Sequence, residues 1–286
     1  MNSRVIGRYP LVSLVPVILA VALLCARCAA PGDSRPPDSG PDNSGPVTLE
    51  QLFTGEVTVL DLSHALSSTN PVWREGAESP FQYEVLAAHE SGLPIMGAFR
   101  TAEHYGTHID APIHGGDHLP TVDEIDLDNL FAPAVVIDIS AQSALDADYA
   151  LTVEDIQNWE AEYGPMPTGS IVLLYTGWSE KWDDPEAYPN RDTDGRLHFP
   201  GFSSESAQYL IDERSIKGVG IDNMSIDPAA GNGFPAHRVV NGSGRIHLEN
   251  VANVHLLPAT GAYLIVAPLK IERGSGGPVR IFGIVP

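Results

Sequence analysis

Cysteine is almost absent from this 286-residue chain. It has two cysteines, Cys25 and Cys28, and both lie within the first thirty residues. If these residues are removed as a leader, the remaining chain has no thiol for a disulfide, a nucleophile or a metal ligand. A metal site there must be built from histidine, carboxylates or backbone oxygen, a donor set that suits zinc or manganese.

Positive charge is also scarce. The chain has 16 lysines and arginines against 37 aspartates and glutamates, a formal net charge of −21, and such a field repels nucleic acid and anionic membranes. No Gly-x-Ser-x-Gly elbow occurs, and Gly218-Val-Gly220 and Gly274-Ser-Gly276 lack the rest of a nucleotide-binding fingerprint. The sequence therefore indicates no nucleic-acid partner, no serine nucleophile and no bound dinucleotide.

The first thirty residues differ from the rest. Arg4 and Arg8 precede a twice-interrupted apolar run over residues 11–25, which small residues follow. This order is typical of a secretory signal, and the run is too short for a typical membrane-spanning helix. We therefore predict a leader over residues 1–30, a disordered Pro/Ser/Gly-rich tether over residues 31–46 and one folded domain over residues 47–286.

Export is the expected localisation, as a secreted or periplasmic protein. The rival interpretation is that a lipid on Cys25 or Cys28 anchors the chain to a membrane at the cell surface. Leu24 and Arg27 fit a lipidation site poorly, so simple secretion is preferred.

From about Val57 onward the sequence predicts an α/β domain. Thr152 caps a helix with Asp155 three residues later, and Ser203 or Ser204 opens a second helix. Residues 181–204 are rich in Asp, Pro, Gly and aromatics and predict a long surface loop, a length typical of lids and binding segments. Short β-branched runs predict strands at residues 57–60, 134–139, 171–175, 263–267 and 279–285.

Three histidines and an aspartate fall within eleven residues, His104-Tyr-Gly-Thr-His108-Ile-Asp110-Ala-Pro-Ile-His114. The glycine and the proline disfavour a helix, so the stretch predicts a turn that leads into an extended segment. There His108 and Asp110 point to the same side, and His114 joins them if the chain stays extended. A structural role in packing would not explain why these titratable side chains lie together, whereas clusters of His and Asp usually mark a metal site.

The remaining histidines give weaker signals. Phe234-Pro-Ala-His237 and His247-Leu-Glu249-Asn250 pass on their own as turn and strand-edge chemistry. Taken singly, the others are interpreted first as surface or hydrogen-bonded core residues: His64, His89, His118, His198, His247 and His255.

The eleven-residue stretch resembles the signature His-x-Gly-Thr-His-x-Asp-x-Pro-x-His of the putative cyclase family, which contains bacterial kynurenine formamidases and isatin hydrolase. It matches that signature at every fixed position. The resemblance extends over about residues 57–286, with further matches at Asp61-Leu-Ser-His64, Thr176-Gly-Trp178, Gly220-Ile-Asp222, Ser225-Ile-Asp227 and Glu249-Asn250.

This resemblance implies a swivelling β/β/α fold, a mixed sheet core with flanking helices, and a metal-dependent hydrolase. His104, His108 and Asp110 would bind the first of one or two Zn²⁺ or Mn²⁺ ions. Asp110 would bridge to a second ion held by His237 and Glu249. The resemblance also implies a homodimer or a larger homo-oligomer.

In the family pattern His114 would be the catalytic histidine. A histidine that titrates near neutrality can accept a proton and return it to the leaving nitrogen of an amide, while a metal-activated hydroxide attacks the carbonyl. Glu103 precedes the first ligand and is a candidate for orienting an imidazole, with a solvated surface position as the alternative.

The preferred function is hydrolysis of a small-molecule amide, in particular a cyclic amide as for isatin hydrolase. N-formylkynurenine arises inside the cell, so an exported arylformamidase of tryptophan catabolism ranks second. A lactone or ester hydrolase and a non-catalytic metal-binding protein are further alternatives. An aromatic substrate would stack on side chains for which core or loop packing is the alternative: Trp73, Phe81, Phe199 or Phe202.

Overall fold

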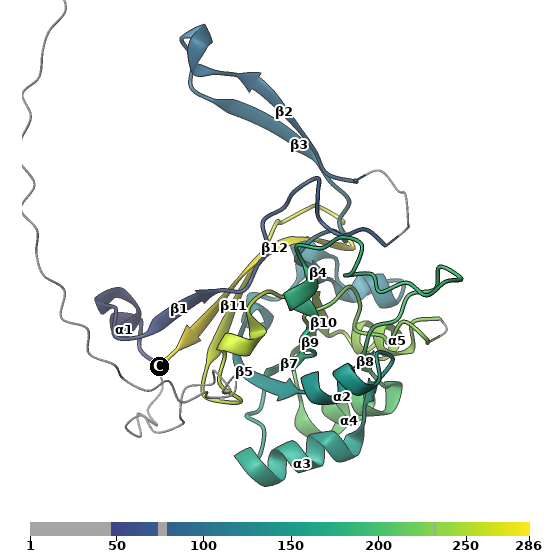
Figure 1. Ribbon diagram of the computed structural model, residues 1–286. Coiled ribbons are helices and arrows are strands. Elements are labelled where there is room, and N and C mark those ends of the chain that lie inside the picture. Colours follow the sequence, from purple (N-terminus) through teal and green to yellow (C-terminus); the bar gives the residue numbers. More distant parts are fainter. Residues whose placement is uncertain (1–46, 74–78, 232) are drawn as a thin grey trace, which may run out of the picture. The chain divides into compact units, whose positions relative to one another are not determined.

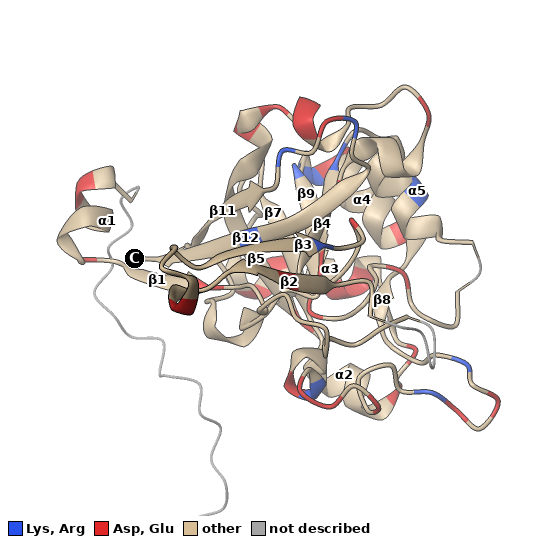
Figure 2. Cartoon of the chain, turned by 90° about the horizontal axis from the view of Figure 1, so that it is seen from above, with Lys and Arg blue, Asp and Glu red and all other residues tan. Residues whose placement is uncertain are grey.

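The computed structural model describes residues 47–73, 79–231 and 233–286 (Figure 1). The leader and tether expected over residues 1–46 lie outside the described residues. Within the described ranges no helix combines the length and apolar character needed to cross a membrane. In Figure 2 the acidic residues are spread over loops, helices and strands.

Strands dominate the described part of the chain. The α-helices are α1 (Leu49–Thr54), α2 (Ser140–Leu145), α3 (Val153–Tyr163), α4 (Ser204–Arg214) and α5 (Pro235–Gly242). The strands are β1 (Thr58–Asp61), β2 (Gln82–Ala87), β3 (Met96–Arg100), β4 (His108–Asp110), β5 (Phe131–Asp138), β6 (Ala150–Leu151), β7 (Ile171–Tyr175), β8 (Gly201–Phe202), β9 (Gly218–Ile221), β10 (Ile246–Glu249), β11 (Tyr263–Pro268) and β12 (Gly276–Val285). The predicted mixed α/β class with a sheet core is confirmed.

Eight strands form the main sheet, in the order β1-β12-β11-β5-β7-β9-β10-β4. β5, β7, β9 and β10 run parallel to one another. β4 pairs with β10 on one side and with the start of β12 on the other, so the pairing returns to a strand already in the sheet. β4 is thus held along both edges, which fixes where its side chains point.

Both faces of the central strands are buried, which explains their continuous apolar runs. Alternate residues of β5 and β7, such as Val136 and Leu173, pack into one core. Val135 and Val172 point the other way and pack with residues of α3, α4 and α5, which lie together beside this part of the sheet in Figure 1.

The two predicted helices begin where their caps indicated. Thr152 accepts a hydrogen bond from the Asp155 backbone, and the Asp155 side chain accepts one from the Thr152 backbone in return. Ser203 caps α4 by accepting from the Ser206 amide. Thr152 and Ser203 thus fix the starts of α3 and α4.

Two features differ from the sequence prediction. The β2–β3 hairpin was not predicted, because its residues are mostly exposed on both faces and show no buried apolar side. Residues 181–204 do not form a simple surface loop: Tyr188 and Phe199 are fully buried and pack with Trp178 and Met224. Aromatic side chains thus anchor this long segment to the body of the protein.

His64 is half-buried and neutral at pH 7. Its ring stacks on Trp182 with 3.9 Å between centroids, and its Nε2 has no hydrogen-bond partner within the described residues. Burial lowers the pKa of His64 from 6.5 to about 4, against the opposing charges of Asp183 and Asp61. Because the folded pKa lies below the unfolded one, this contribution to stability is present above pH 6.5 and is lost as the pH falls toward 4.

We expect His64→Phe to flatten the decline of Tm over this pH range, because phenylalanine keeps a stacking ring and takes up no proton. The difference across the whole window amounts to about 3 kcal/mol. Thermal unfolding in the presence of a chelator measures it, and the exposed His89, changed to Gln, should leave the wild-type slope unaltered. An unchanged slope in His64→Phe would contradict this interpretation.

Candidate metal centre

β4 and β10 bring two imidazoles and two carboxylates to one face. His108 and Asp110 share a side of β4, because alternate residues of a strand point the same way. β10 runs antiparallel beside it, with His247 opposite Asp110 and Glu249 opposite His108. Side chains directly opposite each other in a sheet are neighbours on one face. The extended segment predicted from the sequence is confirmed.

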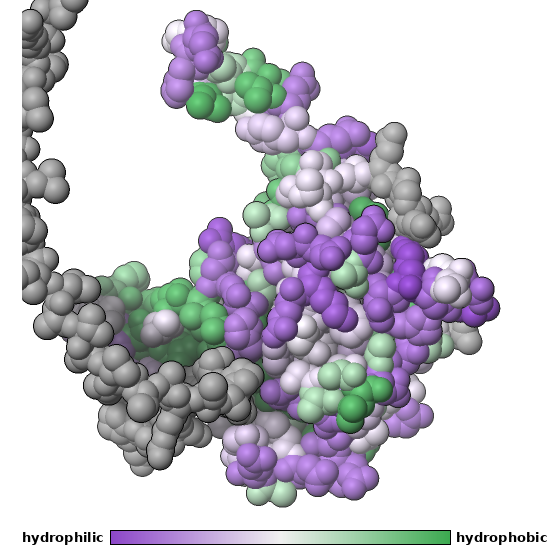
Figure 3. Space-filling view, in the orientation of Figure 1, coloured by the Kyte–Doolittle hydropathy of each residue, from purple (hydrophilic) through white to green (hydrophobic). Residues whose placement is uncertain are grey.

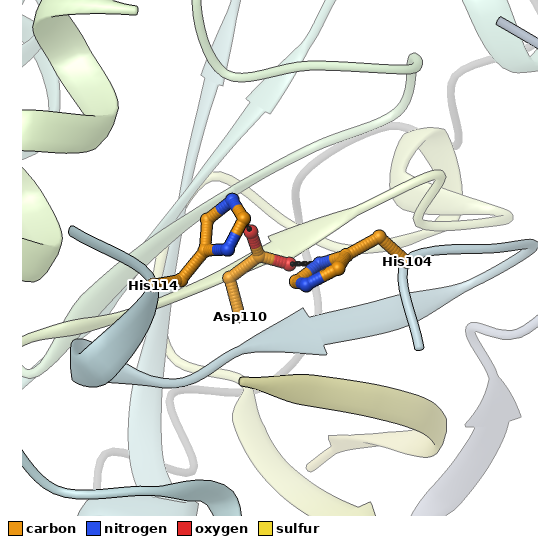
Figure 4. Close-up of side chains that lie close together, drawn as sticks. All are labelled: His104, Asp110 and His114. Carbon is orange, nitrogen blue, oxygen red and sulfur yellow. Dashed lines mark hydrogen bonds and ion pairs between the residues drawn. The ribbon is translucent and has the colours of Figure 1, made fainter. Parts of the chain in front are cut away.

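Gly106 forms the predicted turn ahead of β4, with a φ of +67° that glycine adopts without strain. The turn returns His104 to Asp110, with 2.7 Å between Nδ1 and Oδ1 (Figure 4). His104 Nε2 lies 2.9 Å from Ser275 Oγ, and that hydroxyl donates to Glu103 over 2.5 Å. Glu103 therefore orients His104 through Ser275, an intermediary that the sequence did not suggest.

His114 reaches the same aspartate by another route. The chain bends into a 3₁₀ helix, Pro112–Gly115, and does not stay extended. The bend still brings His114 Nε2 to 3.4 Å from Asp110 Oδ2, and Figure 4 shows the two imidazoles on either side of the carboxylate. Burial and the neighbouring imidazoles lower the pKa of His114, against Asp110, so the ring is neutral at pH 7.

His237 lies in the first turn of α5. The sequence suggested a turn here, but Pro235 is the first residue of a helix, a position that proline favours. Asp227 accepts hydrogen bonds from the His237 amide over 3.1 Å and from its Nδ1–H over 2.6 Å. His237 Nε2 consequently points into the cluster, 3.4 Å from Glu249 Oε1 and 3.9 Å from Asp110 Oδ2.

Three of these imidazoles present a lone pair to a carboxylate. His108 donates its Nδ1–H to the Gly106 carbonyl, so a neutral ring has its lone pair on Nε2, 3.2 Å from Asp110. His104 and His237 likewise have one nitrogen engaged outside the cluster and the other facing it. Lone pairs facing anionic oxygens repel unless a proton or a cation lies between them, so the arrangement fits a cation.

The charges lead to the same conclusion. Burial alone would raise the pKa of Asp110 and of Glu249, but the surrounding imidazoles hold both well below their usual ranges. Burial opposes charge on His108 and His247, yet the carboxylates raise their pKa to about 10 and about 9. A divalent cation would stabilise the carboxylates in place of these protons, and its binding would release them.

The two oxygens of Asp110 face two neighbouring positions. Asp110 Oδ1 lies toward His104 and His108, whereas Oδ2 lies toward His114, His237 and His247. Two groups of donor atoms within the described residues are close enough to hold an ion, one with His104, Asp110 and His114, the other with Asp110, His237 and His247. Imidazole nitrogens and carboxylate oxygens suit zinc or manganese, so these residues fit the implied metal.

The cluster lies in a pocket that has Trp73 and Phe234 among its lining residues. Phe234 was not among the predicted aromatics. Phe199 and Phe202 are fully buried in cores and have no ring face open to a ligand. The sequence left core packing open as the alternative to substrate stacking, and both residues pack in the core. Phe81 packs near Phe99 of the hairpin and is not among the lining residues described.

Residues far apart in sequence support the turn at Gly106. Asn250 donates from Nδ2 to the Gly106 carbonyl over 2.9 Å, and Tyr188 donates to the Asn250 side chain over 2.8 Å. Thr107 donates to the Asn250 carbonyl over 2.6 Å. The central segment 181–204 thus reaches the metal centre through Tyr188.

Known proteins resemble the chain over most of its length. Isatin hydrolase from Roseibium aggregatum is 36% identical over 251 residues, which cover 82% of this chain and 95% of the relative. Kynurenine formamidase from Geobacillus thermodenitrificans is 30% identical over 224 residues, which cover 77% and 94%.

Solved structures show the same relationship. An isatin hydrolase bound to the product analogue thioisatinate superposes with a TM-score of 0.78 at 35% identity, covering 83% of this chain and 95% of the other. A structure described as a potential metal-dependent hydrolase with cyclase activity gives a TM-score of 0.62 at 25% identity, covering 80% and 98%. Residues 60–228, which include the whole His104–His114 signature, match the family described as "Putative cyclase". The resemblance seen in the sequence is therefore confirmed, and the chain belongs to the putative cyclase family.

Proposed function

We propose that the protein is a metal-dependent hydrolase that opens a cyclic amide, acting on a carbon–nitrogen bond other than a peptide bond. The observation that supports this most is the convergence of imidazole lone pairs on Asp110 and Glu249 inside a pocket with aromatic walls. When bound there, a divalent cation lowers the pKa of a water molecule and polarises a carbonyl. The chain's own residues would hold the cation, place the substrate and move protons.

His114 is proposed as the proton carrier. It is neutral at pH 7, and its side chain is 36% exposed at the pocket, whereas His108 and Asp110 are almost fully buried. Its Nε2 would take a proton from the attacking water and return it to the nitrogen that leaves when the carbon–nitrogen bond breaks. Trp73 and Phe234 would flank an aromatic ring.

The metal is proposed to be Zn²⁺ or Mn²⁺, with one or two ions per chain. Imidazole nitrogen and carboxylate oxygen are donors that both metals accept. The two oxygens of Asp110 face different imidazoles, Oδ1 toward His104 and Oδ2 toward His247, and this favours two ions.

Isatin or a related cyclic amide is expected to react faster than N-formylkynurenine. A strained aromatic amide has an activated carbonyl, and the 36% identical relative is an isatin hydrolase. We expect kcat/KM to be higher for isatin with manganese and with zinc, each restored after chelation. A preference for N-formylkynurenine with both metals would favour the arylformamidase alternative, and turnover of a lactone above both would favour an ester or lactone hydrolase. No turnover of any of them by the metal-loaded protein would favour a non-catalytic metal-binding protein.

The protein is also proposed to form a homodimer through the β2–β3 hairpin. An isolated two-stranded hairpin is marginal in water, yet this one exposes Tyr83, Val85 and Phe99, and its apolar side chains are green in Figure 3. The outer face of β1 and β5 likewise exposes Val59 and Phe131. Each copy thus has an apolar hairpin and an apolar sheet face. In a twofold dimer the hairpin of one copy would pack on the sheet face of the other, and both apolar surfaces would be buried.

We expect the wild type to be a dimer by light scattering, and the double variant V85D/F99D to be a monomer that still binds metal. Leu145, an exposed apolar residue on α2, provides the control, because Leu145→Asp should remain dimeric. A monomeric wild type, or a dimeric hairpin variant, would exclude this interface.

A further inference from the structure

His247 belongs to one of the two donor groups described above, but it does not line the pocket, and the proposed mechanism gives it neither substrate nor proton to handle. It is fully buried, and neither ring nitrogen forms a geometrically sound hydrogen bond within the described ranges, although Nε2 lies at ion-pair distance from two carboxylates. His237 and Glu249 are among the residues that line the pocket, whereas His247 is not. Because buried polar groups are normally hydrogen-bonded, the close approach of Nε2 to two carboxylates without a well-formed hydrogen bond is unusual for a purely structural residue.

The position of His247 follows from the strand pairing. It alternates with Glu249 along β10 and lies opposite Asp110 of β4, so all three side chains share a face. Its Nε2 is 3.1 Å from Asp110 Oδ2 and 3.4 Å from Glu249 Oε1. His237 approaches the same two oxygens from α5, at 3.9 Å and 3.4 Å. Each of the two imidazoles therefore approaches the same pair of oxygens, one from each carboxylate, and Asp110, His237 and His247 lie close enough together to hold one ion.

We propose that His247 is the fourth protein donor of a second, closed cation position, whose other donors are Asp110, His237 and Glu249. The inference rests on the proposed metal centre and adds a donor to it. Donor atoms around a tetrahedral zinc ion lie about 3.3–3.5 Å apart, given metal–ligand distances of about 2.0–2.1 Å. Four of the six separations among these donors are 3.1, 3.4, 3.4 and 3.9 Å, and they bracket this value.

The donor set also indicates the class of cation. Two imidazoles favour a transition metal such as zinc over magnesium or calcium, which take oxygen ligands. Four protein donors are typical of closed structural zinc sites, whereas catalytic zinc keeps a position open. The second cation would therefore join β4, β10 and α5, and the position beside His104 and His114 would meet the substrate.

Zinc content per chain tests this assignment. The purified protein is stripped with a chelator, reloaded with excess zinc, desalted and analysed by mass spectrometry. We expect two ions in the wild type and about one in His247→Ala and His247→Gln, because each variant removes a donor of one position. His255, an exposed histidine outside the cluster, is the matched control, and His255→Ala should bind two ions.

Cobalt substitution gives a second readout that does not depend on activity. Four-coordinate Co²⁺ absorbs visible light much more strongly than six-coordinate Co²⁺, so both His247 variants should lose the intense bands that the wild type shows. Circular dichroism in chelator checks the fold, and His247→Gln retains side-chain volume if the alanine variant does not fold. An ion count and a cobalt spectrum equal to those of the wild type would overturn the assignment and leave the proposed function standing. A wild type that binds no cation would overturn both.

Discussion

Asp110→Asn is expected to lose most of its bound metal and at least about 10³-fold in turnover, since it removes a shared donor and the electrostatic stabilisation that depends on it. Asp110 is the residue on which the cluster converges, with Oδ1 2.7 Å from His104 and Oδ2 3.1 Å from His247. An amide at this position has one oxygen and cannot face both cation positions with negative charge. His108→Ala should have a similar effect, because it deletes a nitrogen that faces both carboxylates.

Metal content and turnover should be measured on the same preparation. Asp212 is an exposed carboxylate on α4, far from β4 in sequence and outside the cluster. Asp212→Asn is therefore the matched control and should retain both metal and activity. Normal metal content together with normal turnover in Asp110→Asn would remove this residue from the centre of the site.

His114→Ala is expected to keep its metal and to lose roughly 10²–10⁴-fold in turnover, the usual range for a general acid–base group. Its Nε2 is 3.4 Å from Asp110 Oδ2, but Asp110 has four other imidazole neighbours. Removing His114 should thus affect proton transfer more than cation binding. Because its pKa is lowered, the acidic limb of kcat/KM in the wild type should fall below the ordinary histidine value of about 6.5 and should vanish in the variant.

The exposed His118 provides a control on the same segment. Its φ of +68° favours asparagine as the replacement, so His118→Asn should leave metal and turnover unchanged. If His114→Ala is instead purified without metal and cannot be reloaded, His114 is a ligand, and the proton carrier must be another group.

Local sequence pattern predicted the parts of the site that local geometry determines. The alternation of His108 and Asp110 follows from the period of a strand, and the turn before them requires Gly106 at positive φ. The caps Thr152 and Ser203 act within three residues of themselves, so they could also be recognised. Leader, tether and localisation concern residues outside the described ranges and stay predictions.

Features that depend on contacts between distant segments could not be predicted in this way. His247 faces the cluster because β10 pairs with β4, a contact between residues 137 positions apart. One local signal for its position was the alternation of His247 with Glu249, which puts both side chains on the same side of a strand. Asp227 orients His237 only because α5 begins at Pro235, after Phe234 has turned the chain at positive φ. Phe199 and Phe202 are aromatic in the sequence whether they face a ligand or a core, and burial decided between the two.

Anomalous diffraction from crystals of the purified protein, recorded at the zinc and manganese absorption edges, shows directly whether cations bind at this cluster. We expect strong peaks beside Asp110, one near His104 and His108 and a second near His237 and His247. The same preparation should open isatin, should stop when it is chelated and should recover when the metal is restored. Sustained isatin turnover by protein without an anomalous peak at these residues would exclude a metal-dependent hydrolase centred on Asp110.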